Sequence, residues 1–114
     1  MDTVFTEMIT FQVRPDRIAE FEALIASLKS DLSARPGCVG IRIFKRFYTF
    51  DGVENGQPPR ELTRIVKCVK YYACWEFDSI EACGSANGWL FESHAKEIFK
   101  LLIMPFEINS GYSL

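Results

Sequence analysis

Two segments of the chain have the pattern of long strands and are separated by the stretch DGVENGQPPR at 51–60. Residues 38–50 alternate an apolar face with an aromatic and cationic one, and residues 61–77 are rich in β-branched and aromatic side chains on both faces. Alternation with a period of two is typical of a β-strand, and glycine, proline, asparagine and aspartate favour turns. The two segments therefore predict one long β-hairpin. Both arms exceed the about five or six residues of a usual strand, so we expect them to project beyond the helices of the same chain.

A strand and a helix are predicted before this hairpin. Residues 4–13 alternate in the same way and indicate a first strand. Pro15 suits the first turn of a helix, and apolar residues then recur at spacings of three and four as far as Leu32. We expect the helix to end near Ala34, because Pro36 disfavours helical geometry in the residue before it.

The segment after the hairpin predicts two helical pieces and a strand. Asp78 and Glu81 have the spacing of a helix-capping pair, and the short helix that they begin is expected to break at GSANG, residues 84–88. A second helical piece is predicted from about residue 89 to residue 103. The final FEINSGYSL, residues 106–114, then supplies a shorter last strand.

The elements follow the order strand, helix, strand, strand, helix, strand, which is the order of ferredoxin-like folds. We expect residues 1–114 to form one α+β domain with both helices on one face of a four-stranded antiparallel sheet. The other face would expose Phe44, Tyr48 and their neighbours, an apolar patch larger than monomers usually carry. A homodimer, in which a second copy covers this face, is therefore expected.

Composition and charge narrow the choice of partners. A net charge of −2 supplies no broad basic field for nucleic acid. No apolar run approaches the roughly 18–20 residues of a membrane span, and the N-terminus lacks the pattern of a signal peptide, which predicts a cytoplasmic protein without membrane contact. His94 is the only histidine and no CxxC pair occurs, so we expect no metal site. Four cysteines are interpreted as small buried apolar residues: Cys38, Cys68, Cys74 and Cys83.

Three stretches of the chain resemble the antibiotic biosynthesis monooxygenase family, whose members are dimeric α+β barrels: VRPDRIAEFEALIASL, RPGCVGIRIF and YYACWEFDSIEAC. They correspond to the first strand-to-helix passage, a Pro-Gly turn into the second strand, and a strand that ends in Trp75 before the second helix. The resemblance extends in order over nearly the whole chain. It implies the fold more directly than the function, because this fold also hosts isomerases, haem-handling enzymes and regulatory ligand-binding domains.

Members of this family include enzymes that oxidise electron-rich phenols or quinols with dioxygen and use no metal or flavin. The resemblance thus implies a monooxygenase-like protein without a cofactor, acting on a small aromatic quinol, anthrone or polyphenol. Such a site requires an aromatic slot between sheet and helices and a group that takes up a phenolic proton. It also requires donors that hold the resulting anion beside oxygen.

Two residues of the predicted third strand are candidates for substrate binding. Trp75 matches the family's tryptophan at the end of that strand, and a structural anchor between strand and helix is the alternative role. Some of the oxygenases carry an Asn four residues before this tryptophan, where the present chain has Tyr71. A tyrosine replaces one donor of that amide but not its combined donor and acceptor.

Proton transfer has two candidates, His94 and Tyr72, with Glu76 next. Histidine changes its charge near neutral pH, and His94 lies on the apolar stripe of the last predicted helix. The alternative for His94 is a core histidine bonded to a backbone or tyrosine oxygen.

Arg42 and Phe44 are candidates for substrate binding on the second predicted strand. Arg42 and Arg46 share one face of this strand with Phe44 and Tyr48, and arginines that point into a dimer barrel could hold a phenolate or a carboxylate. Arg46 lies farther along the same strand, and a solvated charge is the favoured interpretation there.

Two other functions remain open. The chain could be a non-catalytic dimeric domain that binds a small ligand or assists a pathway, which the missing Asn favours. Haem degradation is the less favoured alternative, because haem-degrading relatives use an Asn on the first strand and residues 4–13 contain none.

Overall fold

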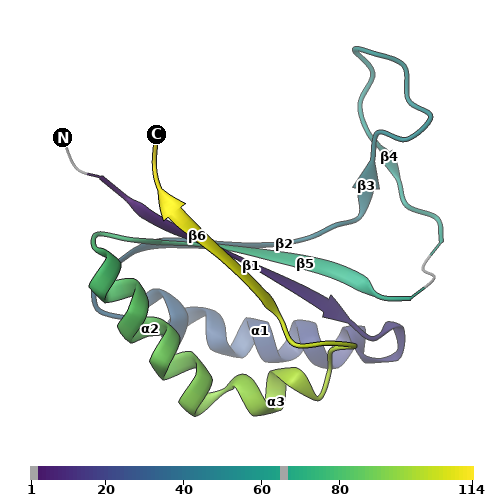
Figure 1. The fold of residues 1–114 in the computed structure, drawn as a ribbon. Coiled ribbons are helices and arrows are strands. Elements are labelled where there is room, and N and C mark those ends of the chain that lie inside the picture. The colour runs from purple at the N-terminus through teal and green to yellow at the C-terminus, as the bar shows by residue number, and fades with distance from the viewer. Residues whose placement is uncertain (1–2, 65–66) are drawn as a thin grey trace.

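The computed structural model describes residues 3–64 and 67–114. A four-stranded antiparallel sheet carries three helices on one face (Figure 1). The strands, in sheet order, are β2 (Cys38–Lys45), β5 (Val69–Phe77), β1 (Phe5–Val13) and β6 (Glu107–Tyr112). The helices are α1 (Ile18–Ser33), α2 (Ile80–Ser93) and α3 (Ala95–Phe99), and a short 3-10 helix (Pro15–Arg17) precedes α1. The predicted α+β ferredoxin-like fold is confirmed.

The core lies between the sheet and the helices. Alternate residues of β1 and β5 point to this side, and the apolar face of α1 covers them. Phe11 of β1 meets Phe21 of α1 with ring centroids 5.3 Å apart. Trp75 and Phe77 at the end of β5 are fully buried. The helix-facing side of the two central strands therefore forms a continuous apolar layer.

Helix α1 ends at Ser33, and the amide of Ala34 donates to the Ser30 carbonyl at 3.0 Å, as the predicted end near Ala34 requires. Gly37 then reverses the chain with φ of +81°, a left-handed conformation that glycine adopts without steric cost. The Gly37 carbonyl accepts a hydrogen bond from the Asp78 amide at 2.9 Å. This bond connects the turn after α1 to the turn before α2.

Helix α2 differs from the prediction of a short helix that breaks at residues 84–88 and a second helical piece that begins near residue 89. It runs unbroken from Ile80 to Ser93 through the glycine-rich stretch, so the expected break there is wrong. Gly84 and Gly88 are exposed, while the core-facing side carries Cys83, Ala86 and Leu90, and the packing of this side outweighs the poor helix propensity of glycine.

The first and last residues of this helical region also differ from the prediction. Ser79 caps α2, since its hydroxyl accepts from the Ala82 amide at 3.1 Å, although Asp78 was the expected cap. The helix then stops at Ser93, and α3 follows after His94 and ends at Phe99, well before the predicted end at residue 103.

The hairpin is present, but its arms are interrupted. Beyond the main sheet it forms a separate two-stranded ladder of β3 (Tyr48–Thr49) and β4 (Arg60–Glu61). We call β3, β4 and the turn that joins them the hairpin arm. As predicted, the arm projects beyond the body of the domain, on the side away from the helices (Figure 1). Ile65 and Val66, which the alternation placed in a strand, lie outside the described residues.

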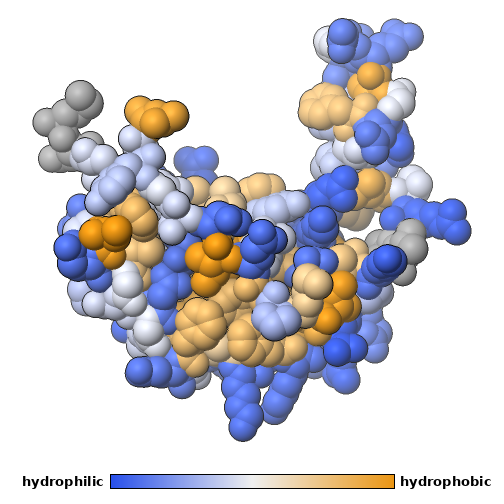
Figure 2. All heavy atoms as spheres, viewed as in Figure 1, coloured by the Kyte–Doolittle hydropathy of each residue, from blue (hydrophilic) through white to orange (hydrophobic). Residues whose placement is uncertain are grey.

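The second face of the main sheet, which we call the open face, is covered by no helix of the described residues (Figure 1). It carries Met8, Tyr72 and Cys74 from the central strands and Arg42 and Phe44 from β2. In the space-filling view, apolar side chains on the arm and over the body lie among hydrophilic ones (Figure 2). The expected exposure of Phe44, at 54%, and of Tyr48, at 56%, is observed.

All four cysteines are free thiols. Only Cys83 is buried, whereas Cys38, Cys68 and Cys74 are half-buried, so the prediction of four buried cysteines holds for one of them. In residues 3–64 and 67–114, no helix combines the length and the apolar content needed to cross a bilayer.

Two glycine-to-alanine substitutions test this account of the backbone. At Gly37 a new Cβ would lie 2.5 Å from the Ala82 Cβ in an unfavourable φ, so Gly37→Ala is expected to destabilise by roughly 2 kcal/mol or more. Gly84 has open space around its Cα and lies within α2, so Gly84→Ala is expected to stabilise by about 0.5–1 kcal/mol. Urea unfolding measures both, and loss of stability in Gly84→Ala would contradict a continuous α2.

Candidate functional site

A cavity of about 280 Å³ lies between α1 and β2, the strand at one edge of the sheet. We call it the α1–β2 groove. Aromatic and aliphatic side chains form most of its wall, together with two lysines and one glutamate. The lining residues are Phe21, Glu22, Ile25, Ala26, Lys29, Ile43, Phe44, Lys45 and Tyr71. The groove is thus an apolar slot with a small number of polar groups, the usual composition of a small-molecule site.

Tyr71, Glu22 and Lys45 make a connected polar group in this wall. Tyr71 is buried under α1, where its ring packs on Phe21 with centroids 4.7 Å apart. The Tyr71 hydroxyl donates a hydrogen bond to Oε2 of Glu22. The ammonium of Lys45 lies 3.4 Å from the same oxygen. A carboxylate, a hydroxyl and an ammonium are therefore held together beside the apolar slot.

The ionisation of this group follows from its contacts. The hydrogen bond from Tyr71 lowers the pKa of Glu22, and the nearby Lys45 lowers this pKa further, so Glu22 is a carboxylate at neutral pH. Burial and the adjacent carboxylate raise the pKa of Tyr71, so its hydroxyl stays protonated. The side chain of Glu22 remains 49% exposed, which leaves the carboxylate accessible from the groove.

The two tyrosines of β5 lie on opposite faces of the sheet. Tyr72 is on the open face, where its ring lies 5.3 Å from that of Phe44. Arg42 is also on the open face, opposite Cys74 in the β2–β5 register. Phe44 alone joins the two regions, because it also lines the α1–β2 groove. The structure thus groups Phe44, Arg42 and Tyr72 on the open face and separates them from the buried Tyr71.

Trp75 lies deeper than the groove. Its indole N–H donates to the Leu32 carbonyl at 3.2 Å, and its ring packs on Phe77 with centroids 4.9 Å apart. These contacts attach the end of α1 to β5. In this position Trp75 acts as an anchor between helix and strand, and direct contact with a substrate stays a prediction.

His94 lies at the junction of α2 and α3. Its Nδ1 is 2.7 Å from Oε1 of Glu97, and its ring meets the edge of Trp89 with centroids 5.0 Å apart. It is not among the residues that line the α1–β2 groove. His94 therefore has a carboxylate partner, in place of the expected backbone or tyrosine oxygen, and its catalytic role stays a prediction.

A buried carboxyl on β1 was missed by the sequence analysis. Glu7 is 2% exposed and lies on the helix-facing side, opposite Trp75 in the β1–β5 register. Asn87 Nδ2 donates to Glu7 Oε1 at 2.6 Å, and Cys83 Sγ lies 3.5 Å from the same oxygen. The other oxygen of Glu7 and the amide oxygen of Asn87 have no hydrogen-bond partner among the described residues.

Burial decides the protonation of this cluster. Loss of hydration raises the pKa of Glu7, and the bonds from Asn87 and Cys83 offset this increase only in part. Burial also raises the pKa of the Cys83 thiol, to about 11. The sequence did contain a signal, because Glu7 shares the odd-numbered positions of β1 with apolar residues: Phe5, Ile9, Phe11 and Val13. A lone acid on an apolar strand face predicts a buried carboxyl.

The described parts of the chain contain no cluster of three or more His, Cys, Asp or Glu side chains suited to a metal ion. The described residues form a ferredoxin-like α+β fold with an apolar groove beside its edge strand. The model of the antibiotic biosynthesis monooxygenase family matches residues 4–55, which include β1, α1 and β2. The resemblance to this family that the sequence predicted is thereby confirmed.

Solved structures share the fold over nearly the whole chain. Rv0793 from Mycobacterium tuberculosis superposes with a TM-score of 0.71 at 16% identity, covering 97% of this chain and 95% of that one. A conserved protein from Methanosarcina mazei Go1 has a TM-score of 0.64 at 19% identity, with 96% and 92% covered.

A third similar structure carries a stated activity. It is a mutant of SnoaB, a cofactor-independent oxygenase from Streptomyces nogalater, with a TM-score of 0.59 at 21% identity and 100% and 93% covered. No curated protein matches the chain. At these identities the structural likeness concerns the fold alone.

The buried Glu7 makes stability depend on pH. Its pKa is raised above the ordinary 4.5, so the stability that it contributes is full below that pH and is lost as pH rises through the folded-state pKa. Glu7→Gln removes this ionisation while keeping an oxygen for Asn87. Glu7→Gln changes the free energy of unfolding, and we expect this change to be more stabilising at pH 8 than at pH 4.5.

Denaturant unfolding at the two pH values measures this difference, with the exposed Glu92→Gln as the matched control. An equal effect of Glu7→Gln at both pH values would show that Glu7 has the same pKa in the folded and unfolded chains.

Proposed function

We propose that this protein is a cofactor-independent monooxygenase that binds a small electron-rich aromatic in the α1–β2 groove. The substrate class is a quinol, an anthrone or a polyphenol. The observation that carries the proposal is the hydrogen bond between Tyr71 and Glu22 in the wall of an apolar slot. The family match and the fold shared with a cofactor-independent oxygenase support it.

The groove suits a flat aromatic of modest size. Its volume of about 280 Å³ is just below the ~300–1,000 Å³ of sites for drug-sized ligands. Phe21 and Tyr71 supply aromatic surface, and Ile25 and Ile43 supply aliphatic surface. Rings prefer offset or edge-to-face contacts with such side chains. Two or three fused rings would use the apolar wall and leave an oxygen substituent near the polar group.

The polar group can generate the reactive anion. The Glu22 carboxylate takes up a proton from the substrate, while the Tyr71 hydroxyl and the Lys45 ammonium stabilise the enolate or phenolate that forms. The electron-rich anion then reacts with dioxygen, so the substrate itself is the reductant. A positioned base of this kind contributes a factor of roughly 10²–10⁴ to the rate.

The reaction balances without another electron donor. In anthrone, the methylene carbon loses two hydrogens and gains one atom of dioxygen as a carbonyl oxygen. The second oxygen atom leaves with those two hydrogens as water. Four electrons thus pass from the carbon to dioxygen, and no metal, flavin or added reductant takes part.

A homodimer completes the proposal. The open face and the arm expose Phe44, Tyr48 and Phe50, the last at 66%, and a second copy of the chain would bury this surface. Phe44 belongs to both the open face and the groove. Dimer formation would therefore also cover one wall of the groove and exclude water from it.

Oxygen uptake with anthrone, dihydroxynaphthalene and quinol substrates tests the reaction, without added metal or reductant. Glu22→Gln is expected to lower the rate by about 10²-fold or more, because the base is lost. Tyr71→Phe is expected to lower it by about tenfold, because one donor to the anion is lost. Glu20→Gln is the matched control, since Glu20 lies on α1 but pairs with Arg17 outside the groove.

His94→Ala separates the two candidate bases in the same assay. An unchanged rate would remove the role of His94, and a loss as large as that of Glu22→Gln would contradict Glu22 as the sole base. Tight binding of these aromatics without oxygen uptake would favour a non-catalytic ligand-binding domain. No uptake and no binding would refute the proposed function.

The solution mass tests the dimer. At micromolar concentration we expect sedimentation to give twice the 13.1 kDa of one chain. Met8→Glu places a charge in the middle of the open face and is expected to give monomers. Ile80→Glu, an equally polar change in the exposed first turn of α2, is expected to remain dimeric. A wild-type monomer would overturn the dimer proposal but would not contradict the proposed role of the α1–β2 groove.

A further inference from the structure

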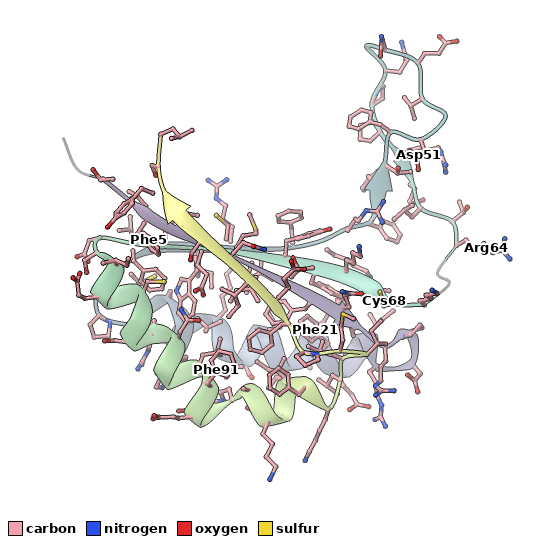
Figure 3. The ribbon with its side chains drawn as sticks, viewed as in Figure 1. Phe5, Phe21, Asp51, Arg64, Cys68 and Phe91 are labelled. Atoms are coloured by element: carbon pink, nitrogen blue, oxygen red, sulfur yellow. The ribbon has the colours of Figure 1, made fainter. Side chains whose placement is uncertain are left out.

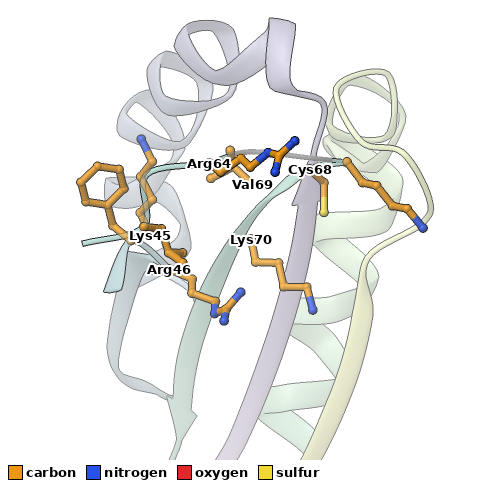
Figure 4. A pocket seen from close by; sticks show the side chains of 9 residues that line it. Lys45, Arg46, Arg64, Cys68, Val69 and Lys70 are labelled. Carbon is orange, nitrogen blue, oxygen red and sulfur yellow. The ribbon is translucent and has the colours of Figure 1, made fainter. Parts of the chain in front are cut away.

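A second cavity, of about 340 Å³, lies at the base of the hairpin arm and shares only Lys45 with the α1–β2 groove. It forms where the end of β2 meets the start of β5. We call it the basic pocket, and Figure 4 shows that its side chains come from the end of β2 and from the segment that leads into β5. It is lined by Lys45, Arg46, Phe47, Leu62, Arg64, Lys67, Cys68, Val69 and Lys70.

Interrupted strand pairing produces this cavity. The Arg46 amide donates to the Lys70 carbonyl at 2.8 Å, and the Leu62 amide donates to the Phe47 carbonyl at 2.8 Å. Arg46 and Phe47 are adjacent, whereas residues 63–69 separate their two partners. Arg64, Lys67 and Cys68, which line the pocket, lie in no strand, so the pairing is interrupted between these two hydrogen bonds.

The pocket gathers positive charge in a slightly acidic chain. Five of its lining residues are cationic and none is acidic, although the chain has 13 Lys and Arg against 15 Asp and Glu. Lys45 pairs with Glu22. Arg46, Arg64, Lys67 and Lys70 form no ion pair with any residue that the structure describes. Several like charges without counter-charges create a local positive potential that an anion would relieve.

The pocket also has an apolar part. Phe47, Leu62 and Val69 line it, and Val69 is buried at the start of β5. The Lys45 ammonium lies 5.3 Å from the centroid of the Phe47 ring, which shows that a cation and an aromatic face meet at this wall. A ligand that carries charge alone would leave these three apolar side chains without a partner.

We propose that the basic pocket binds a small organic anion, with an aryl or acyl body against Phe47, Leu62 and Val69. Its carboxylate, sulfonate or phosphate group lies among the cationic ends of Arg46, Arg64, Lys67 and Lys70. The cavity volume fits a ligand of about two rings or a short acyl chain. This site is separate from the proposed oxidation, since only Lys45 lines both cavities.

Titration with 2-naphthoate, followed by calorimetry and by amide chemical shifts, tests the proposal. Binding is expected to shift the amides of Arg46 and Lys70 and to weaken as salt rises, because exposed charges are screened. The double variant Arg64→Ala/Lys67→Ala is expected to weaken binding by about tenfold or more. Lys96→Ala/Lys100→Ala removes two exposed lysines near α3 and is expected to leave binding unchanged.

Three further measurements distinguish the basic pocket from a purely apolar site, from a simple anion site and from the α1–β2 groove. Naphthalene-2-carboxamide, a neutral probe of the same shape, is expected to bind at least about tenfold more weakly, because it lacks the charge. Inorganic phosphate is likewise expected to bind more weakly than 2-naphthoate, because it lacks the apolar body. Ala26→Phe fills the α1–β2 groove and is expected to leave 2-naphthoate binding intact.

The proposal is overturned by absence of 2-naphthoate binding, by binding that is insensitive to Arg64→Ala/Lys67→Ala, or by binding that Ala26→Phe abolishes. It is also overturned if 2-naphthoate does not bind and the Arg64→Ala/Lys67→Ala variant loses a salt-sensitive dimer. That result would assign these cations to acidic side chains of a second copy.

Discussion

The antiparallel pairing of β1 with β5 is the interaction on which the core and both candidate sites depend. Its register continues without a bulge along the whole of β1. Because side chains alternate across a sheet, this register places Tyr71 and Trp75 under the helices and Tyr72 on the open face. A slip of one residue would exchange the two sets and expose the core to water. In Figure 3, Phe21 lies between the sheet and the helices, and Asp51 lies on the distant arm.

Two glutamates show how the same residue type acquires opposite properties in this frame. Glu7 lies inside the sheet–helix layer, where the cost of burying a charge raises its pKa. Glu22 lies at the edge of the sheet, where a tyrosine donor and a lysine lower its pKa. Glu22 is ionised at neutral pH and lines the α1–β2 groove, whereas Glu7 lines neither that groove nor the basic pocket. The proposed base, Glu22, therefore lies at the edge of the sheet, whereas Glu7 is a buried carboxyl that accepts a hydrogen bond from Asn87.

The order of the elements, the end of α1 and the exposed aromatics could be predicted from the sequence, because each depends on local pattern. The continuity of α2 could not be predicted, because the free-energy cost of Gly84 within a helix depends on whether it faces solvent or the core. The candidate site was predicted as one group, but β5 is apolar on both faces and its alternation does not say which side lies under the helices. Glu22 was not predicted because its partner Tyr71 is 49 residues away in the chain. Only tertiary packing brings the two together.

Lys45 links the two proposed sites through a single ammonium group. It is the last residue of β2, and its side chain lines both the α1–β2 groove and the basic pocket. An anion in the basic pocket would compete with Glu22 for this cation. Loss of the attraction of Lys45 would shift the pKa of Glu22 back toward its ordinary value and make the carboxylate a stronger base. Thermodynamic linkage makes the effect reciprocal, so protonation of Glu22 would strengthen the binding of an anion at the base of the arm.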